Sequence, residues 1–250
     1  GGLGNQMFQY AFFRSIKKMR GNVKIDTSWF RLKQQKEYPR PLKLEHAFNI
    51  DLSVDSHDGD YYKFSRYPVL IRITNRFLRI FSSYQLRNME LESLKLVEDS
   101  SELPKHYIFK KKGYLDGYWQ SEDYFIDLKD KIKLIFTFNK IEDEIVKRIE
   151  HDILSTEDSV ALHWRRGDYV GHKSLGLDLT KYMYNSLKYI SKTRPIKDVF
   201  VFSEDMAWVK KRLIEFGFNI KYHFVSSELS YKPDYYELYL MSKAKHNIIF

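Results

Sequence analysis

Short apolar runs alternate with segments of helical period from residue 159 to the last residue, and this alternation constrains the fold more than any other feature. The apolar runs predict strands at 160–164, 199–202, 220–225 and 247–250. Between them, apolar residues recur at helical spacing and predict helices at 178–190, 206–216 and 234–244. Strands that alternate with helices in this way predict a parallel sheet in an α/β fold.

The first of these strands ends in two arginines, Arg165 and Arg166, which are followed by Gly167 and Asp168. In open α/β sheets, ligands bind at the carboxyl ends of the strands. Two guanidiniums there suit a pyrophosphate, because each one donates two parallel hydrogen bonds and keeps its charge. The alternatives are that both arginines are solvated or form structural ion pairs. The tripeptide Arg-Gly-Asp also occurs in adhesion loops, but three residues recur too often by chance to indicate one.

The second strand of the series is followed by Ser203, Glu204 and Asp205. We expect Asp205 to cap the next helix. In a regular sheet these residues also lie beside the arginine turn. A carboxylate at that place can accept two N–H groups of a guanine, which adenine does not offer in the same arrangement. Between the two carboxylates, Asp205 is the preferred candidate.

The amino-terminal stretch GGLGNQ leads into a helix whose apolar residues run from Met7 to Met19 and which ends at Gly21. Asn5 is the expected N-cap. Such a glycine-rich loop lets a ligand approach the backbone N–H groups at the positive end of a helix. The same glycines also suit a plain connecting turn. Because the chain begins at Gly1 and its last strand looks unfinished, we expect both ends to be truncated.

An aromatic stretch, YLDGYWQSEDYF, occupies residues 114–125. Aromatic faces stack on the apolar side of a sugar ring, while Asp, Gln and Glu side chains can bond its hydroxyls. The stretch therefore predicts either a sugar-binding surface or aromatic core packing. From composition alone the two are equally supported.

The composition excludes several classes of protein. The chain has 250 residues, of which 43% are hydrophobic, so it can bury a core; it has no cysteine, which excludes a disulfide scaffold and a thiolate zinc site. The net charge of +9 suits nucleic acid, anionic lipid or phosphorylated small molecules. No nucleic-acid-binding motif accompanies it. A D-x-D at 58–60 does not follow an apolar strand, so it indicates a solvated loop, and no metal site is predicted.

Residues 61–89 contain six basic residues and no acidic one. Within them Arg72, Arg76 and Arg79 share one helical face, which is typical of a helix that lies on an anionic membrane. The alternative is a helix packed on the protein with its arginines in water. No apolar stretch reaches the roughly 18 residues of a membrane span, and there is no secretory signal. We therefore expect a cytoplasmic protein, in which a packed helix is the favoured interpretation of residues 61–89 and a peripheral contact at the inner membrane face is the alternative.

Four stretches, in this order, resemble the motifs of the α-1,2-fucosyltransferases, glycosyltransferase family 11. They are GGLGNQMFQYA at 1–11, HWRRGDY at 163–169, FSED at 202–205 and YYELYLMSKAKHNIIF at 235–250. The aromatic stretch also has a counterpart in the family. This chain departs from the family pattern in having Ala244 where many members have cysteine. It also stops before the serines and tryptophan pair that normally follow the last motif.

The resemblance implies a GT-B architecture of two facing Rossmann-like halves. Residues 1–140 would form the acceptor side and residues 141–250 the GDP-fucose side, with a helix at 141–154 between them. The reaction implied is inverting transfer of L-fucose from GDP-fucose to the 2-hydroxyl of a terminal β-galactoside, without metal or cofactor. It places the enzyme in a bacterial surface-glycan pathway and gives no role to nucleic acid.

The resemblance also assigns roles to residues of this chain. The donor contacts would be Gly4, Asn5, His163, Arg165, Arg166, Ser203, Glu204 and Asp205. For His163 the equally supported alternative is a histidine that only packs at the end of its strand. Arg165 would stabilise the charge that grows on the leaving phosphate, with Arg166 supporting the turn. Asp168 would form a local ion pair or act as the general base.

Two rival functions stay open at this point. A fucosyltransferase of another linkage, α-1,6 or protein-O-fucose, would share the arginine motif, but the amino-terminal motif and Tyr169 favour α-1,2. A basic module that binds nucleic acid or phosphoinositides would use the net charge but has no use for the four motifs.

Overall fold

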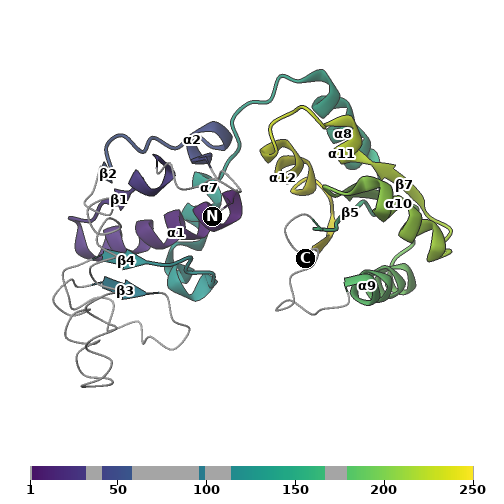
Figure 1. Ribbon diagram of the computed structural model, residues 1–250, viewed down its shortest axis with the longest axis horizontal. Helices are drawn as coiled ribbons and strands as arrows, with labels where there is room; N and C mark the ends of the chain where they lie inside the picture. The colour runs from purple at the N-terminus through teal and green to yellow at the C-terminus, as the bar shows by residue number, and fades with distance from the viewer. Residues whose placement is uncertain (1, 32–40, 58–95, 99–113, 167–178, 250) are drawn as a thin grey trace, which may run out of the picture. The chain divides into compact units, whose positions relative to one another are not determined.

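The computed structural model describes residues 2–31, 41–57, 96–98, 114–166 and 179–249 (Figure 1). The chain divides into two compact units, Gly1–Asn139 and Lys140–Phe250. We call them unit 1 and unit 2. The sequence placed the division between residues 140 and 141. The assignment of the acceptor to the first part and of the donor to the second stays a prediction.

Unit 2 is built on a four-stranded parallel sheet with the strand order β7-β6-β5-β8. The strands are β5 (Val160–His163), β6 (Asp198–Phe202), β7 (Lys221–Phe224) and β8 (His246–Ile249). The prediction of an α/β fold with a parallel sheet is confirmed. The two central strands, β5 and β6, are buried almost throughout, as parallel strands covered on both faces are.

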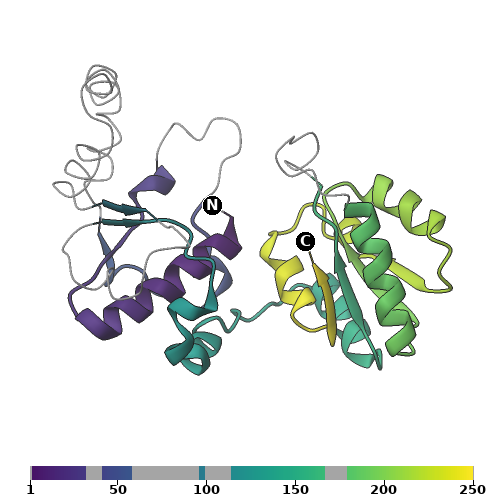
Figure 2. The ribbon, with the colours of Figure 1, turned by 90° about the horizontal axis from the view of Figure 1, so that it is seen from below.

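Helices cover both faces of this sheet (Figure 2). On one face lie α9 (Leu179–Thr193) and α10 (Met206–Glu215). On the other lie α8 (Glu144–Ser155), α11 (Val225–Glu228) and α12 (Tyr235–Met241). Successive side chains of β5 point to opposite faces of the sheet. Val160 and Leu162 pack in the core beneath α9 and α10, and Ala161 packs in the core on the other face.

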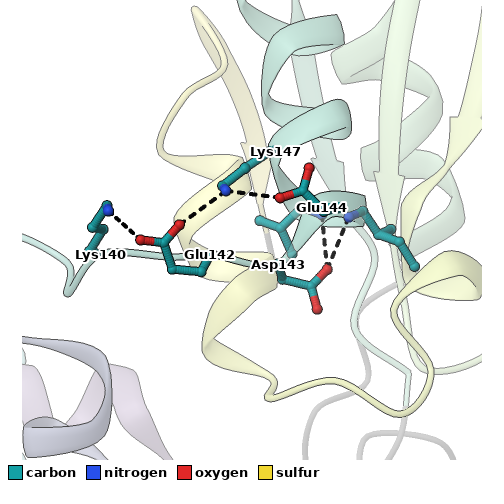
Figure 3. Close-up of polar contacts among 7 residues, drawn as sticks. Lys140, Glu142, Asp143, Glu144 and Lys147 are labelled. Atoms are coloured by element: carbon teal, nitrogen blue, oxygen red, sulfur yellow. Dashed lines mark hydrogen bonds and ion pairs between the residues drawn. The ribbon is translucent and has the colours of Figure 1, made fainter.

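The start of α8 shows how unit 2 begins (Figure 3). The Asp143 carboxylate caps the helix by accepting the backbone N–H groups of Ile145 and Val146 at 3.0 and 3.3 Å. It also holds the Lys232 ammonium at 2.5 Å, and this hydrogen bond lowers the pKa of Asp143. The predicted helix at 141–154 therefore begins three residues later than expected, because Asp143 is its cap.

Unit 1 is organised around α1 (Leu3–Arg20), which ends at Gly21 with φ 72°, as predicted. Two short parallel pairs lie beside it: β1 (Ile25–Asp26) with β2 (Ser56–His57), and β3 (Leu96–Glu98) with β4 (Tyr114–Asp116). Unit 1 also contains two short helices, α2 (Leu44–Ala47) and α7 (Lys129–Ile135). Three 3₁₀ turns lie at Ser28–Arg31, Glu122–Tyr124 and Ile126–Leu128.

Two local predictions are wrong. Asn5 does not cap α1, because the helix begins at Leu3 with Gly2 in the cap position, so that Gly4 and Asn5 lie in the first turn. The third strand of unit 2 ends at Phe224, because Val225 begins α11 instead of extending β7.

Several predicted features lie outside the described residues. They are the D-x-D at 58–60, the basic segment 61–89, Gly167, Asp168 and Tyr169, and Asp178, the first residue of the helix predicted at 178–190. Within the described ranges, none of the helices is long and apolar enough to cross a membrane.

Candidate active site

The carboxyl ends of β5 and β6 lie side by side in register, His163 opposite Phe202. The backbone N–H of Trp164 continues the ladder by donating to the Phe202 carbonyl at 2.9 Å. The turn that carries Arg165 and Arg166 therefore follows one strand directly where Ser203 follows the other. Two stretches that are 38 residues apart in sequence thus meet at the sheet edge, as the Arg166 N–H to Glu204 contact at 3.3 Å shows.

Ser203 connects the turn that carries Arg165 and Arg166 with the turn that carries Glu204 and Asp205. Its side chain, which is only 4% exposed, donates to the Trp164 carbonyl at 2.6 Å and accepts the Asp205 N–H at 3.2 Å. Its own backbone N–H donates to the Ser226 hydroxyl at 3.0 Å. The Ser203 hydroxyl is thus occupied within the protein, and the residue fixes the spacing of the arginine turn and the carboxylate turn.

Three contacts fix the position of Arg166. Its Nε donates to Asp205 Oδ2 at 3.0 Å, and its guanidinium lies 3.6 Å from the centre of the Trp208 ring. The third contact is the bond from its backbone N–H to Glu204. An ion pair combined with a cation–π contact holds a guanidinium in one orientation. Arg166 therefore braces the turn.

Asp205 uses both of its carboxylate oxygens within the protein. While Oδ2 accepts from Arg166, Oδ1 accepts the backbone N–H of Trp208 at 3.3 Å and caps α10. The prediction that Asp205 is an N-cap is confirmed. Its contact with a guanine stays a prediction, and the same holds for Glu204, whose side chain is exposed at this edge.

His163 and Arg165 are half-buried at the end of β5. His163 lies between Phe202 of β6 and Ile249 of β8 in the strand register. Arg165 lies between the buried Trp164 and the braced Arg166. The backbone on both sides of Arg165 is therefore fixed, which suits a side chain that has to meet a charged ligand in one place.

Glu237 is a further residue at this edge, and the motif comparison did not single it out. It is the only acidic residue of α12, and burial raises its pKa. A hydrogen bond from Ser226 partly offsets that rise, and the charges of Glu204 and Asp234 add to it. The signal available in the sequence was a single acid within the otherwise apolar and aromatic helix YYELYLM.

The predicted contacts from the amino-terminal motif lie in unit 1. The Asn5 Oδ1 accepts the Gln120 Nε2 at 2.7 Å, and one helical turn later Gln9 Nε2 donates to the Gly117 carbonyl at 2.8 Å. The amino-terminal motif is thus joined to the aromatic stretch. Gly4 is exposed in the first turn of α1.

Among the residues that the structure describes, no group of three or more His, Asp or Glu side chains is placed to hold a metal ion. Neutralisation of a bound phosphate by arginine alone stays a prediction.

Comparison with known proteins adds a family. The model described as glycosyl transferase family 11 matches residues 1–249. An alpha-1,2-colitosyltransferase of Escherichia coli is 30% identical over 259 residues, which cover 100% of this chain and 81% of that protein. The O-antigen biosynthesis glycosyltransferase WbnK of Escherichia coli is 29% identical over 273 residues, which cover 100% of this chain and 84% of that protein. No solved structure gives a significant match.

Proposed function

The chain belongs to glycosyltransferase family 11, and from this premise we propose that it moves L-fucose from GDP-fucose to the 2-hydroxyl of a terminal β-galactoside. The observation that carries the proposal is the arginine turn locked beside a carboxylate turn at the carboxyl edge of a parallel sheet. Ligands of open α/β sheets bind at that edge. An arginine pair with adjacent carboxylates there suits the diphosphate and the base of a guanine nucleotide.

The reaction we propose is a single displacement. The 2-hydroxyl of galactose attacks the anomeric carbon of β-linked GDP-fucose, and the bond from that carbon to the β-phosphate oxygen breaks. GDP leaves with the bonding electrons, and the hydroxyl proton passes to a base. The product is an α-linked fucoside, so the anomeric configuration inverts.

The two arginines take different parts in this proposal. Negative charge grows on the leaving phosphate as the bond breaks, and Arg165 stabilises it. Arg166 supports Arg165 indirectly, because its own guanidinium is held by Asp205 and Trp208. Asp168, the next acid along the chain, forms a local ion pair or accepts the hydroxyl proton.

Colitose is a second candidate for the transferred sugar. The observation that favours it is the similarity to the α-1,2-colitosyltransferase. Colitose is the 3-deoxy form of L-fucose, so a site that merely tolerates the 3-hydroxyl would accept both donors, whereas a site that bonds it would favour fucose strongly.

Three further parts of the proposal rest on the family and on the sequence. They are the GT-B arrangement of two facing halves, a cytoplasmic location in a surface-glycan pathway, and a peripheral contact with anionic membrane. The relative WbnK, by its name an enzyme of O-antigen biosynthesis, supports the pathway. The family also favours an enzyme over a basic binding module.

The test is incubation of the protein with GDP-fucose, GDP-colitose and a panel of galactosides. We expect an α-1,2-fucoside, with the linkage assigned by NMR, and activity that survives EDTA. An α-1,6 product would support the rival linkage. Transfer from GDP-colitose but not from GDP-fucose would make colitose the transferred sugar. A salt-dependent gel shift with plain DNA, without any sugar transfer, would favour the nucleic-acid-binding module.

A further inference from the structure

The segment Gly117–Gln120 places one tyrosine on the surface of unit 1 in a conformation that the core enforces. Tyr118 is 46% exposed, whereas the next residue, Trp119, is only 2% exposed. The Trp119 ring stacks on Phe12 at 4.2 Å and meets Tyr124 edge-on at 5.5 Å. Because Trp119 is anchored inward, its neighbours on either side are displayed outward.

The backbone at Trp119 is strained. Its φ of 55° lies in the left-handed region that residues with a side chain rarely adopt, at a cost of about 1–3 kcal/mol. Burial of the indole against α1 offsets that cost. Glycine would be the unstrained residue for this turn, so a tryptophan here indicates that packing determines the course of the turn and the display of Tyr118.

Two amide contacts fix the segment further. Gln9 holds the Gly117 carbonyl at 2.8 Å, and Gln120 is bonded to Asn5 at 2.7 Å. These bonds use one N–H of Gln120 and the carbonyl oxygen of Asn5. The second N–H of Gln120, and the NH2 group of Asn5, have no partner in the part of the chain that is described. The amide pair therefore keeps donors that can meet a ligand hydroxyl.

The chemistry of this surface is neutral. Asn5, Gln9, Tyr118 and Gln120 carry no charge, and the next charged side chains along the described chain, Glu122 and Asp123, are acidic and exposed. An acidic border disfavours a phosphate group. A sugar ring suits the surface, because a tyrosine face packs on the apolar side of a pyranose while amides bond its hydroxyls.

We propose that Tyr118, Gln120 and Asn5 bind the terminal galactose ring of the acceptor. This inference rests on the proposed function and adds a location for the acceptor to it. It also moves Asn5 from the donor contacts to the acceptor contacts. The ring of Tyr118 stacks on the sugar, and the amide pair holds the hydroxyls that do not react.

The first test is a comparison of Michaelis constants in the full chain. Tyr118→Ala should raise the acceptor KM about 10-fold, the scale of one lost aromatic contact. The KM for GDP-fucose and its slow hydrolysis without acceptor should not change. Tyr118→Phe keeps the ring and should stay near the wild type. Tyr231→Ala is the matched control, since Tyr231 is 99% exposed in unit 2. An unchanged acceptor KM in Tyr118→Ala would overturn the proposal.

A second measurement separates this proposal from the proposed function. Saturation-transfer NMR with methyl β-galactoside should show contact with the wild-type protein, and the signal should fall in Tyr118→Ala but persist in Tyr231→Ala. If no galactoside is fucosylated but this pattern holds, the function fails and the sugar site stands. If galactosides are fucosylated but methyl β-galactoside gives no signal, or one that Tyr118→Ala leaves intact, the site fails and the function stands.

Discussion

The two candidate surfaces differ in both charge and construction. The edge of unit 2 is ionic, with Arg166 held by Asp205 and with Glu204 and Glu237 close by. The surface of unit 1 is neutral and is made of a tyrosine and two amides. In unit 2 the strand register brings the residues together, while in unit 1 the side chains of α1 hold the segment in place.

This difference follows from what each surface is proposed to bind. A diphosphate needs fixed positive charge, and a fixed arginine needs anionic and aromatic neighbours that hold it. A neutral sugar needs a rigid aromatic face and hydrogen-bond donors, and packing can supply that rigidity without charge. The comparison predicts that unit 1 is sensitive to packing changes and unit 2 to changes of charge.

The largest expected effect is at Trp119. Trp119→Ala removes a buried indole that stacks on Phe12, and such a change costs about 3–5 kcal/mol of stability. We expect calorimetry to show a lower unfolding temperature for unit 1 while the parallel sheet of unit 2 unfolds as before. Trp119→Phe keeps a stacking ring and is the matched control. A loss in Trp119→Ala no greater than in Trp119→Phe would mean that the stack does not hold the segment.

Arg165 should give the next largest effect, on rate. Removal of a preorganised donor aimed at developing charge costs about 10²–10³ in kcat, roughly 3–4 kcal/mol, and we expect at least that for Arg165→Ala. Arg165→Lys should also be badly impaired, because a point charge cannot replace the planar fork. Arg166→Lys should be milder, since that side chain braces the turn. Thermal melts must show that each variant is folded.

The effect of metal removal on kcat is a further test of the role of Arg165 at the leaving phosphate. If the protein alone neutralises the diphosphate, EDTA should leave kcat unchanged. An enzyme that EDTA inactivates and Mn²⁺ restores, with Arg165→Lys fully active, would contradict the mechanism.

Variants of Asp205 can distinguish a structural role of this carboxylate from a role in recognising guanine. Asp205→Ala removes both the cap of α10 and the ion pair with Arg166 and should cost more than the roughly 1 kcal/mol of a lost cap, while Asp205→Asn keeps a capping oxygen and loses only the ion pair. If Asp205 contacts guanine, both variants should lose most of the preference for GDP over ADP and UDP in calorimetric titration. Retained preference in Asp205→Asn would limit Asp205 to capping and to holding Arg166.

The smallest effect concerns Glu237 and pH. Its pKa is raised above the ordinary 4.5, chiefly by burial, so the folded state holds the proton more tightly than the unfolded state. The stability that the protonated Glu237 carboxyl contributes is complete below its pKa in the unfolded state, and it is lost as pH rises through its pKa in the folded state. Glu237→Gln should therefore melt higher than the wild type at pH 7 and equally at about pH 4. A lower melting temperature at both values would show that the carboxylate itself is needed for the fold.

The sequence motifs and the spacing of apolar residues predicted the strands and helices of unit 2 well, but those of unit 1 only in part. The apolar runs of unit 2 became parallel strands, because a sheet covered on both faces needs continuous apolar strands. In unit 1 the glycine-rich entry was misjudged at Asn5, since cap preferences act locally and a tertiary partner, Gln120, competed for that side chain. Burial likewise separated Tyr118 from Trp119, which the aromatic stretch by itself left undecided.

Local sequence is enough to predict membership of glycosyltransferase family 11, the strand that ends in two arginines, and the cap at Asp205. Each of these depends on neighbours along the chain. The packing of the strands and helices is needed to show which arginine is braced, that the Ser203 hydroxyl is used internally, and that Glu237 lies at the sheet edge with a raised pKa. Hydrogen-bond partners and burial depend on residues that are far apart in sequence and that meet only when the chain folds.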